Sequence, residues 1–330
     1  MPSRSEQRDE LVERILGDHL TLTNAEAAAR GGLSEENARR LWRALGFPDP
    51  GDDVAFGPHD VEAIAIVAST IDHDLLDEET VFRLTRAVGH TMARLADWQV
   101  STLVDQITAD VEDGRSTSRL EAAIRLVGAA GPGFERLMTR AWRRHLAAAA
   151  ARFEAQGAAD AEILSKSMSV GFADLTRFTS LSNRLDDDEL GALVEEFETR
   201  VTDLVTAGGG RVIKTMGDAV LFVHEDPKAA ARVSLDIISA IAARDDLPSV
   251  RVGLATGSVI NRMGDVFGPP VNLAARLAQV ARAHRLLVDQ VTADALGDEF
   301  ERRALPPRQV RGFGAYSPIT VAERRGFRSR

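Results

Sequence analysis

Six polar residues between positions 174 and 276 have the types and spacing that chemistry on a nucleotide requires. They lie in three segments: VGFADLTRFTSLS (170–182), GGGRVIKTMGDAVLFV (208–223) and MGDVFGPPVNLAARL (263–277). The six are Asp174, Lys214, Asp218, Asp265, Asn272 and Arg276. Carboxylates can hold divalent metal ions, a lysine with a carboxylate can read a base edge, and an amide with a guanidinium can stabilise a reacting phosphate. Together they predict a site that cyclises a nucleoside triphosphate.

The two candidate metal ligands are Asp174 and Asp218. Asp174 ends an apolar run, and a helix should begin directly after it. The amides at that helix start, around Thr176, Phe178 and Thr179, could receive a triphosphate. Asp218 lies at the tip of a predicted hairpin between VIKTM and AVLFV. Alone, the first would be a helix cap and the second a turn residue. As a pair on adjacent strands they predict two metal ions, one activating a ribose 3′-hydroxyl and one neutralising the departing pyrophosphate.

Lys214 and Asp265 are the candidate base-reading pair. Only three of the 40 basic residues are lysines, so a lysine here suggests a need for one compact donor. Lys214 precedes Asp218 by four residues, and an even separation places both on one face of a strand. Lys214 donating to a ring nitrogen and Asp265 accepting from an exocyclic amine would match adenine. The ordinary alternatives are a solvated strand lysine and a loop carboxylate.

Asn272 and Arg276 are separated by one turn of a helix predicted to begin near Pro270. Such a pair is usually solvent-exposed or ion-paired. Here it follows Asp265 at a short distance along the chain. Arg276 could therefore stabilise charge on an α-phosphate, while Asn272 orients the ribose.

The elements that must position these residues fall into two parts. Before about residue 157, apolar residues recur at three- and four-residue spacing, which predicts helices. These helices cover 6–18, 24–30, 34–45, 58–71, 77–94, 97–111, 118–129 and 133–156, with breaks at 31–32, 48–51 and 131–133.

Beyond residue 165, apolar runs typical of strands alternate with helical stretches. The predicted strands are 168–173, 211–214, 219–223, 250–255, 286–289 and 319–322, and the helices are 186–206, 227–243, 270–283 and 290–295. This pattern predicts an α+β domain. We therefore expect a helical domain at 1–157, a linker at 158–165 and a catalytic domain at 166–330.

Charge and composition limit which partners and which cellular compartment are expected for this chain. A net charge of −10 provides no overall attraction for nucleic acid or an anionic membrane. The chain has no cysteine, which excludes disulfides and thiolate chemistry and fits a reducing compartment. No apolar run is long enough to span a bilayer, and the first 20 residues lack the apolar centre of a signal peptide. We therefore expect a cytoplasmic protein without membrane insertion.

Residues from about 166 to 322 resemble the catalytic domain of class III adenylate cyclases, through FADLTRFT, KTMGDA and DVFGPPVNLAAR. The resemblance implies a ferredoxin-like, palm-type domain that converts ATP to 3′,5′-cyclic AMP and pyrophosphate with two Mg²⁺ or Mn²⁺ ions per site. It implies metal binding by Asp174 and Asp218, adenine selection by Lys214 and Asp265, and transition-state contacts by Asn272 and Arg276. Arg311, in QVRGFG, resembles a basic residue that contacts the triphosphate.

The same resemblance implies a homodimer. In that family, metal and base contacts come from one catalytic domain and the asparagine–arginine pair from the other. Because this chain carries the full set, two copies would form two equivalent sites.

The N-terminal part resembles, as a whole, the helical regulatory domain of mycobacterial-type soluble adenylate cyclases, some of which respond to pH. Residues 22–66 resemble a MerR-type helix-turn-helix through EAA, GGLS and the ALGFPDP turn. Residues 1–60 carry 7 arginines against 12 acidic residues, so we expect no nucleic-acid partner. His145, among arginines in the last predicted helix of this part, is a candidate pH sensor. A lipid or other small ligand of these helices is an alternative signal.

Two other functions fit parts of the sequence. A guanylate cyclase would share the metal and phosphate residues, but Lys214 and Asp265 favour adenine. A nucleotide-sensing, DNA-binding regulator would use the helix-turn-helix, but the negative charge around it does not favour DNA.

Overall fold

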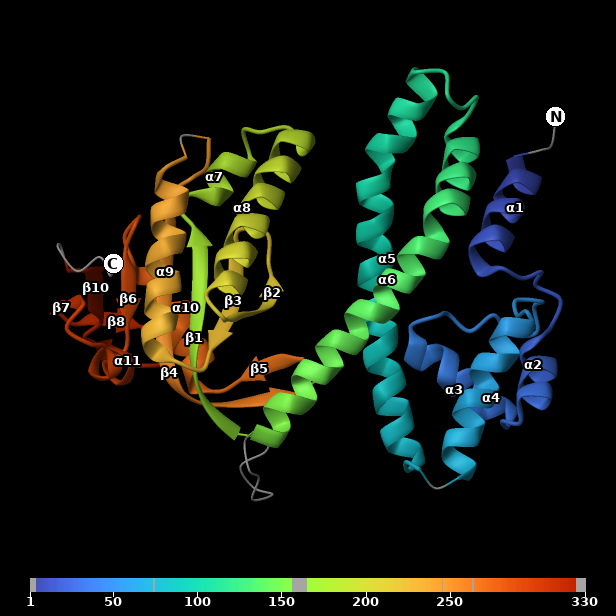
Figure 1. Ribbon diagram of the computed structural model, residues 1–330, viewed down its shortest axis with the longest axis horizontal. Helices are drawn as coiled ribbons and strands as arrows, with labels where there is room; N and C mark the ends of the chain where they lie inside the picture. Colours follow the sequence, from blue (N-terminus) through green and yellow to red (C-terminus); the bar gives the residue numbers. More distant parts are fainter. Residues whose placement is uncertain (1–3, 74, 156–164, 245, 263, 325–330) are drawn as a thin grey trace. The chain divides into compact units, whose positions relative to one another are not determined.

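The computed structural model describes residues 4–73, 75–155, 165–244, 246–262 and 264–324 (Figure 1). The chain divides into two compact units, Met1–Ala150 and Ala151–Arg330, each described here by itself. The predicted linker at 158–165 lies outside the described residues, except for Ser165, which begins the first strand. Among the described residues, no helix is long and apolar enough to cross a membrane.

The first unit begins with four short helices: α1 (Arg4–Leu16), α2 (Asn24–Gly31), α3 (Glu35–Leu45) and α4 (Pro58–Asp72). Thr23 caps α2 in a capping box with Glu26, and the Ser34 side chain caps α3. The apolar faces of α2, α3 and α4 pack around the buried side chains of Leu41 and Ile64.

Two long helices, α5 (Glu78–Glu112) and α6 (Arg119–Ala155), complete this unit. The prediction of two helices in place of each of them was wrong. The gap at 95–96 holds good helix formers, so α5 continues through it. Helix α6 runs through Pro132, because a proline costs one backbone hydrogen bond while long helical segments on both sides retain theirs. Buried Asp110 holds the α5–α6 turn through ion pairs with Arg115 and Arg125.

The second unit is a mixed sheet with helices on both faces. Its helices are α7 (Phe178–Ser182), α8 (Asp187–Ala207), α9 (Pro227–Ala242), α10 (Pro269–Val280) and α11 (Gln290–Ala295). Its main strands are β1 (Ser165–Leu175), β2 (Arg211–Thr215), β3 (Ala219–His224), β4 (Val250–Arg262), β6 (Leu286–Val288) and β10 (Ile319–Glu323). All six predicted strands are present.

The strand order is β2-β3-β1-β4-β6-β10-β7, with β7 at Phe300–Ala304 and β5 (Asp265–Phe267) paired to β4. Its first four strands are antiparallel and follow the β1-α8-β2-β3-α9-β4 order of a ferredoxin-like unit. A small sheet of β8 (Arg308–Val310) and β9 (Gly314–Tyr316) stands apart. The sequence analysis missed β5, β7, β8 and β9, because they are short, and β7 in particular is polar and largely exposed.

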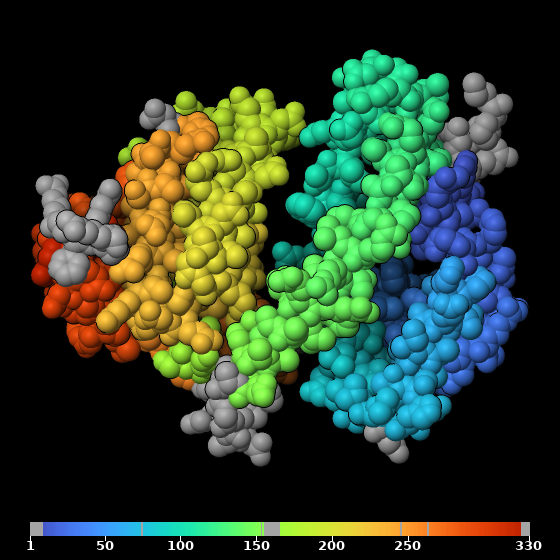
Figure 2. Space-filling view, in the orientation of Figure 1, coloured from blue at the N-terminus to red at the C-terminus, as the bar shows by residue number. Residues whose placement is uncertain are grey.

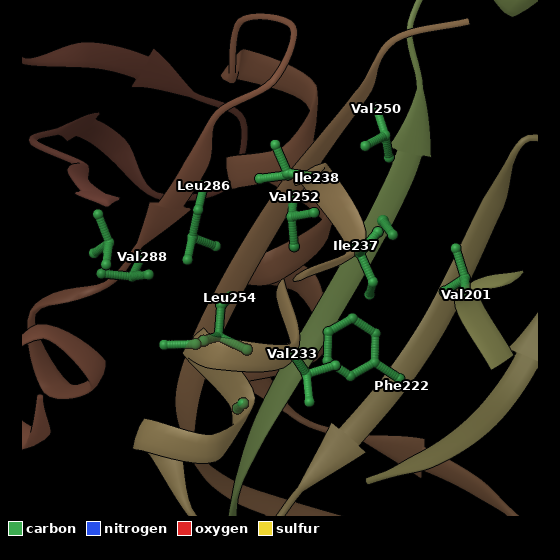
Figure 3. Packing of buried hydrophobic residues seen from close by; sticks show 14 of the residues in the cluster. Val201, Phe222, Val233, Ile237, Ile238, Val250, Val252, Leu254, Leu286 and Val288 are labelled. Atoms are coloured by element: carbon green, nitrogen blue, oxygen red, sulfur yellow. The ribbon is translucent and has the colours of Figure 1, made fainter. Parts of the chain in front are cut away.

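Successive side chains on the central strands point to opposite faces of the sheet, and helices pack on both faces. Val250, Val252 and Leu254 of β4 face the apolar core formed with α8 and α9 (Figure 3). Helices α8 and α9 contact each other and lie side by side over this face (Figure 2). The intervening residues of β4 face α10, which lies so close that a Cβ at Gly253 would overlap the Ala274 carbonyl. Any polar group of β1 or β4 on this second face therefore lies beside α10.

Candidate active site

Asp174 lies on the α10 face of the sheet, one residue before the end of β1. Its neighbours Ala173 and Leu175 point into the core on the other face. Strand pairing places Asp174 opposite Ala219 on β3 and opposite Arg251 on β4. The amide of Leu175 donates to the backbone carbonyl of Asp218 at 2.8 Å, so both candidate metal ligands lie at the same strand end.

Asp218 occupies a tight turn rather than a strand. β2 ends at Thr215, the Met216 amide donates to the Ala219 carbonyl at 2.8 Å, and Gly217 has a φ of +73°. Glycine adopts this left-handed conformation without strain, which lets the turn close beside β1. The prediction that Lys214 and Asp218 share a strand face was therefore wrong in its geometry.

Charges around Asp174 are only partly balanced. Burial raises the pKa of its carboxyl, the hydrogen bond and charge of Arg251 oppose that rise, and the charge of Asp218 adds to it. The Arg251 Nε donates to Oδ2 of Asp174 at 2.6 Å, and the Asp174 side chain is only 18% exposed. Asp174 and Asp218 are neighbouring carboxylates and Arg251 bonds to Asp174, so this pair suits an additional cation. Among the described residues, no group of three or more His, Cys, Asp or Glu side chains gathers, so such a site would rest on these two carboxylates.

Lys214 and Asp265 meet although 51 residues separate them. Lys214 Nζ donates to Asp265 Oδ2 at 2.6 Å, and both side chains remain about one-third exposed, at 38% and 31%. Burial opposes it, but the bonds from Lys214 and the Val266 amide hold the pKa of Asp265 below its usual value. One face of this pair is therefore open to a ligand that offers an acceptor and a donor.

Helix α10 carries Asn272 and Arg276, as the sequence predicts. Asn272 is exposed and Arg276 is half-buried. The Arg276 Nη1 donates to the Oε1 of Gln279 at 2.7 Å, within the same helix. Glycine at position 268, with a φ of +145°, and Pro269 at the first turn fix where α10 begins.

Arg251 is the residue that sequence reasoning missed. It contacts Asp174 through Nε and donates from Nη1 to the Gln279 carbonyl at 2.8 Å. A signal was present, because Arg251 interrupts the apolar run of a central strand at the position that faces away from the core. Charged groups in such places are uncommon unless they are paired.

The remaining predicted residues are placed as follows. The Thr176 amide donates to the Ser249 carbonyl at 2.7 Å, and Phe178 packs against the core at the start of α7, where Thr179 follows. Arg311 is exposed in the turn between β8 and β9. His145 is exposed on α6, in the other unit. Their predicted roles stay predictions.

We expect two substitutions to move the pKa of Asp174 in opposite directions. Asp218→Asn should lower it by removing a nearby negative charge, and Arg251→Met should raise it by removing a cation. The folded chain holds this proton more tightly than the unfolded chain. The free energy of unfolding therefore decreases as pH rises from 3.8, the ordinary value, towards the folded pKa. A ¹³C NMR titration of the carboxyl carbon measures the shift, and a pKa that moves in the same direction in both variants would contradict this electrostatic account.

Comparisons with known proteins show which proteins the second unit is similar to. Residues 163–321 match the family described as the adenylate and guanylate cyclase catalytic domain. The catalytic core of a rhodopsin-guanylyl cyclase with converted specificity, solved with ATPαS, aligns with a TM-score of 0.46 and 25% identity, over 48% of this chain and 97% of that one. Over residues 163–321 the second unit is similar to the catalytic domains of nucleotide cyclases.

Two relatives that match most of this chain are adenylate cyclases. An adenylate cyclase of Streptomyces coelicolor is 38% identical, over 94% of this chain and 88% of that protein. An adenylate cyclase of Streptomyces griseus is 40% identical, over 86% of this chain and 70% of that protein. The chain belongs to the class III adenylate cyclase family.

Proposed function

We propose that this protein converts ATP to 3′,5′-cyclic AMP and pyrophosphate at sites shared by two copies of the chain. The observation that carries the proposal is the contact of Lys214 with Asp265 in the same domain that brings Asp174 and Asp218 to one strand end. Within a class III cyclase family, this contact supplies a base-reading pair in a domain that also carries a candidate metal site.

Asp174 and Asp218 would hold two Mg²⁺ or Mn²⁺ ions, which suit the unbalanced negative charge at this strand end. When bound, such ions lower the pKa of the ribose 3′-hydroxyl and neutralise the departing pyrophosphate. Arg251, already bonded to Asp174, is close enough to this end to contribute positive charge towards the phosphates. Because the Thr176 amide already donates to the Ser249 carbonyl, the further proposed phosphate contacts are the amides of Phe178 and Thr179, the Thr176 side chain, and Arg311.

Lys214 and Asp265 would select adenine over guanine. Lys214 donates to a ring nitrogen, and Asp265 accepts from the exocyclic amine. Guanine presents a carbonyl at that position, which cannot donate to the carboxylate, so guanine loses this hydrogen bond and places two acceptors against each other. The lowered pKa of Asp265 keeps it ionised, and therefore an acceptor, at neutral pH.

Asn272 and Arg276 would act on the second chain's substrate, with Asn272 orienting the ribose and Arg276 stabilising the charge that develops on the α-phosphate. Two copies related by a two-fold axis would then form two equivalent sites, each using both chains. The exposure of Asn272 and the solvent-facing side of α10 support this arrangement.

Asp174→Ala and Arg276→Ala should each lower the rate of cyclic AMP formation by at least about 100-fold, since each removes a charge that acts in the transition state. The assay is cyclic AMP production from ATP with Mn²⁺, with folding checked by circular dichroism. Asp203→Ala and Arg282→Ala, which alter exposed residues outside the site, are the matched controls and should keep wild-type activity. Near-normal turnover in either site variant would remove that residue from the mechanism.

The double variant Lys214→Glu/Asp265→Ser reverses the donor and acceptor pattern of the base-reading pair. We expect the preference for ATP over GTP, as a ratio of kcat/KM values, to fall by about 100-fold or more, because ATP would leave both groups mispaired. Lys166→Glu/Glu225→Ser is the matched control, since that ion pair, at 2.5 Å, lies elsewhere. An unchanged nucleotide preference would refute the assignment and reopen the guanylate cyclase alternative.

We further propose that the N-terminal helices form a cytoplasmic regulatory domain with a MerR-like helix-turn-helix at about 22–66. Arg39 and Arg40 pair with Glu35, Glu78 and Glu79, which leaves little free positive charge for DNA. A DNA-binding regulator is therefore the weaker alternative, and a salt-sensitive complex with duplex DNA would favour it.

The regulatory signal would be pH or an apolar ligand such as a lipid. His145 is the candidate pH sensor, and exposed Trp98 and Trp142 on the long helices support an apolar ligand. Cyclic AMP production from about pH 5.5 to about pH 8 by wild type and His145→Ala tests the first idea. Identical profiles would exclude His145.

A further inference from the structure

Three hydrogen bonds join the candidate metal ligand Asp174 to the candidate transition-state residue Arg276 within one chain. Arg251 Nε donates to Asp174 Oδ2 at 2.6 Å, and its Nη1 donates to the backbone carbonyl of Gln279 at 2.8 Å. The side-chain Oε1 of Gln279 accepts from Arg276 Nη1 at 2.7 Å. Gln279 is thus bonded to Arg251 through its backbone and to Arg276 through its side chain.

The end of α10 depends on arginines from outside the helix. The last carbonyls of a helix have no partner within it. Here Arg251 donates to the Gln279 carbonyl, and Arg308 Nη1 donates to the Val280 carbonyl at 3.1 Å. Both cations also lie at the negative end of the helix dipole. Because the guanidinium is a rigid planar fork, a shift of Arg251 on Asp174 changes its hold on Gln279.

We propose that Gln279 is the positioning residue of Arg276 and couples its orientation, through Arg251, to the state of Asp174 in the same chain. The inference rests on the proposed function. In a homodimer with shared sites, Asp174 serves one site and Arg276 of the same chain serves the other. The link therefore runs between the two active sites.

The coupling has a predictable sign. A cation that takes up the Asp174 carboxylate competes with Arg251 for it. The end of α10 holds Arg251 in place and so disfavours the cation. By thermodynamic reciprocity, loosening the α10 end should strengthen cation binding, and cation binding should change how Arg276 is held.

Four forms of the full-length protein test this: wild type, Gln279→Met, Gln279→Glu and Gln290→Ala. Methionine has the length of glutamine but no side-chain oxygen, so it removes the bond that ties Arg276 to the end of α10 and leaves the backbone carbonyl that accepts from Arg251 on a less restrained helix end. Glutamate keeps an acceptor for Arg276. Gln290 is the matched control, because it is also an exposed helical glutamine, and its Nε2 donates to Asp294, four residues on, at 2.7 Å.

For Gln279→Met we expect kcat for cyclic AMP formation to fall about fivefold with KM for ATP within about twofold, as for a contact that acts in the transition state. We also expect Mn²⁺, measured without nucleotide from the EPR signal of the free ion, to bind about threefold more tightly. Gln279→Glu and Gln290→Ala should stay within about twofold of wild type in both measurements.

An unchanged kcat or an unchanged Mn²⁺ affinity in Gln279→Met would overturn the inference, as would equal effects in Gln290→Ala. A wild type that forms no cyclic AMP would refute the proposed function instead. The Mn²⁺ measurement needs no turnover, so it still decides whether the link exists.

Discussion

The antiparallel pairing of β1 with β4 is the constraint on which the site depends. In this register, Ala173 and Leu175 point into the core with Val250 and Val252, and the intervening residues must point to the opposite face. A shift of one residue would bury charges in that core, which makes the register strongly specified. Asp174 and Arg251 therefore meet beside α10 as a consequence of packing on the far side of the sheet.

Within the single chain, several charged groups of the site have internal partners. Lys214 pairs with Asp265, Arg251 pairs with Asp174, and Arg276 bonds to Gln279. Under the proposed function, substrate and metal would replace these internal partners, so binding exchanges one set of charge-assisted bonds for another. Such an exchange gives these three groups partners in the absence of substrate, and it gives the protein contacts through which one group can influence another.

Local patterns in the sequence predict some elements of this site, whereas other features depend on contacts between distant residues. Apolar runs and turn residues locate β2, β3 and α11 closely, since those signals depend on near neighbours. Lys214 and Asp265 could be paired from the sequence by their fit to one base edge and by the family resemblance, but their contact across 51 residues depends on strand pairing that local patterns do not show. Arg251 went unnoticed because its meaning lies in its partner across the sheet. The continuous α6 was missed because a proline is read locally as a break, whereas helix stability sums over many turns.

The central claim is that each active site draws on both chains, and mixing two inactive variants tests it most directly. Asp174→Ala and Arg276→Ala are combined in equal amounts under conditions in which subunits exchange. A shared site predicts recovery of about a quarter of wild-type activity, because half of the dimers are then mixed and each contains one intact site. Activity that stays at the level of the separate variants, although mixed dimers are shown to form, would contradict the account.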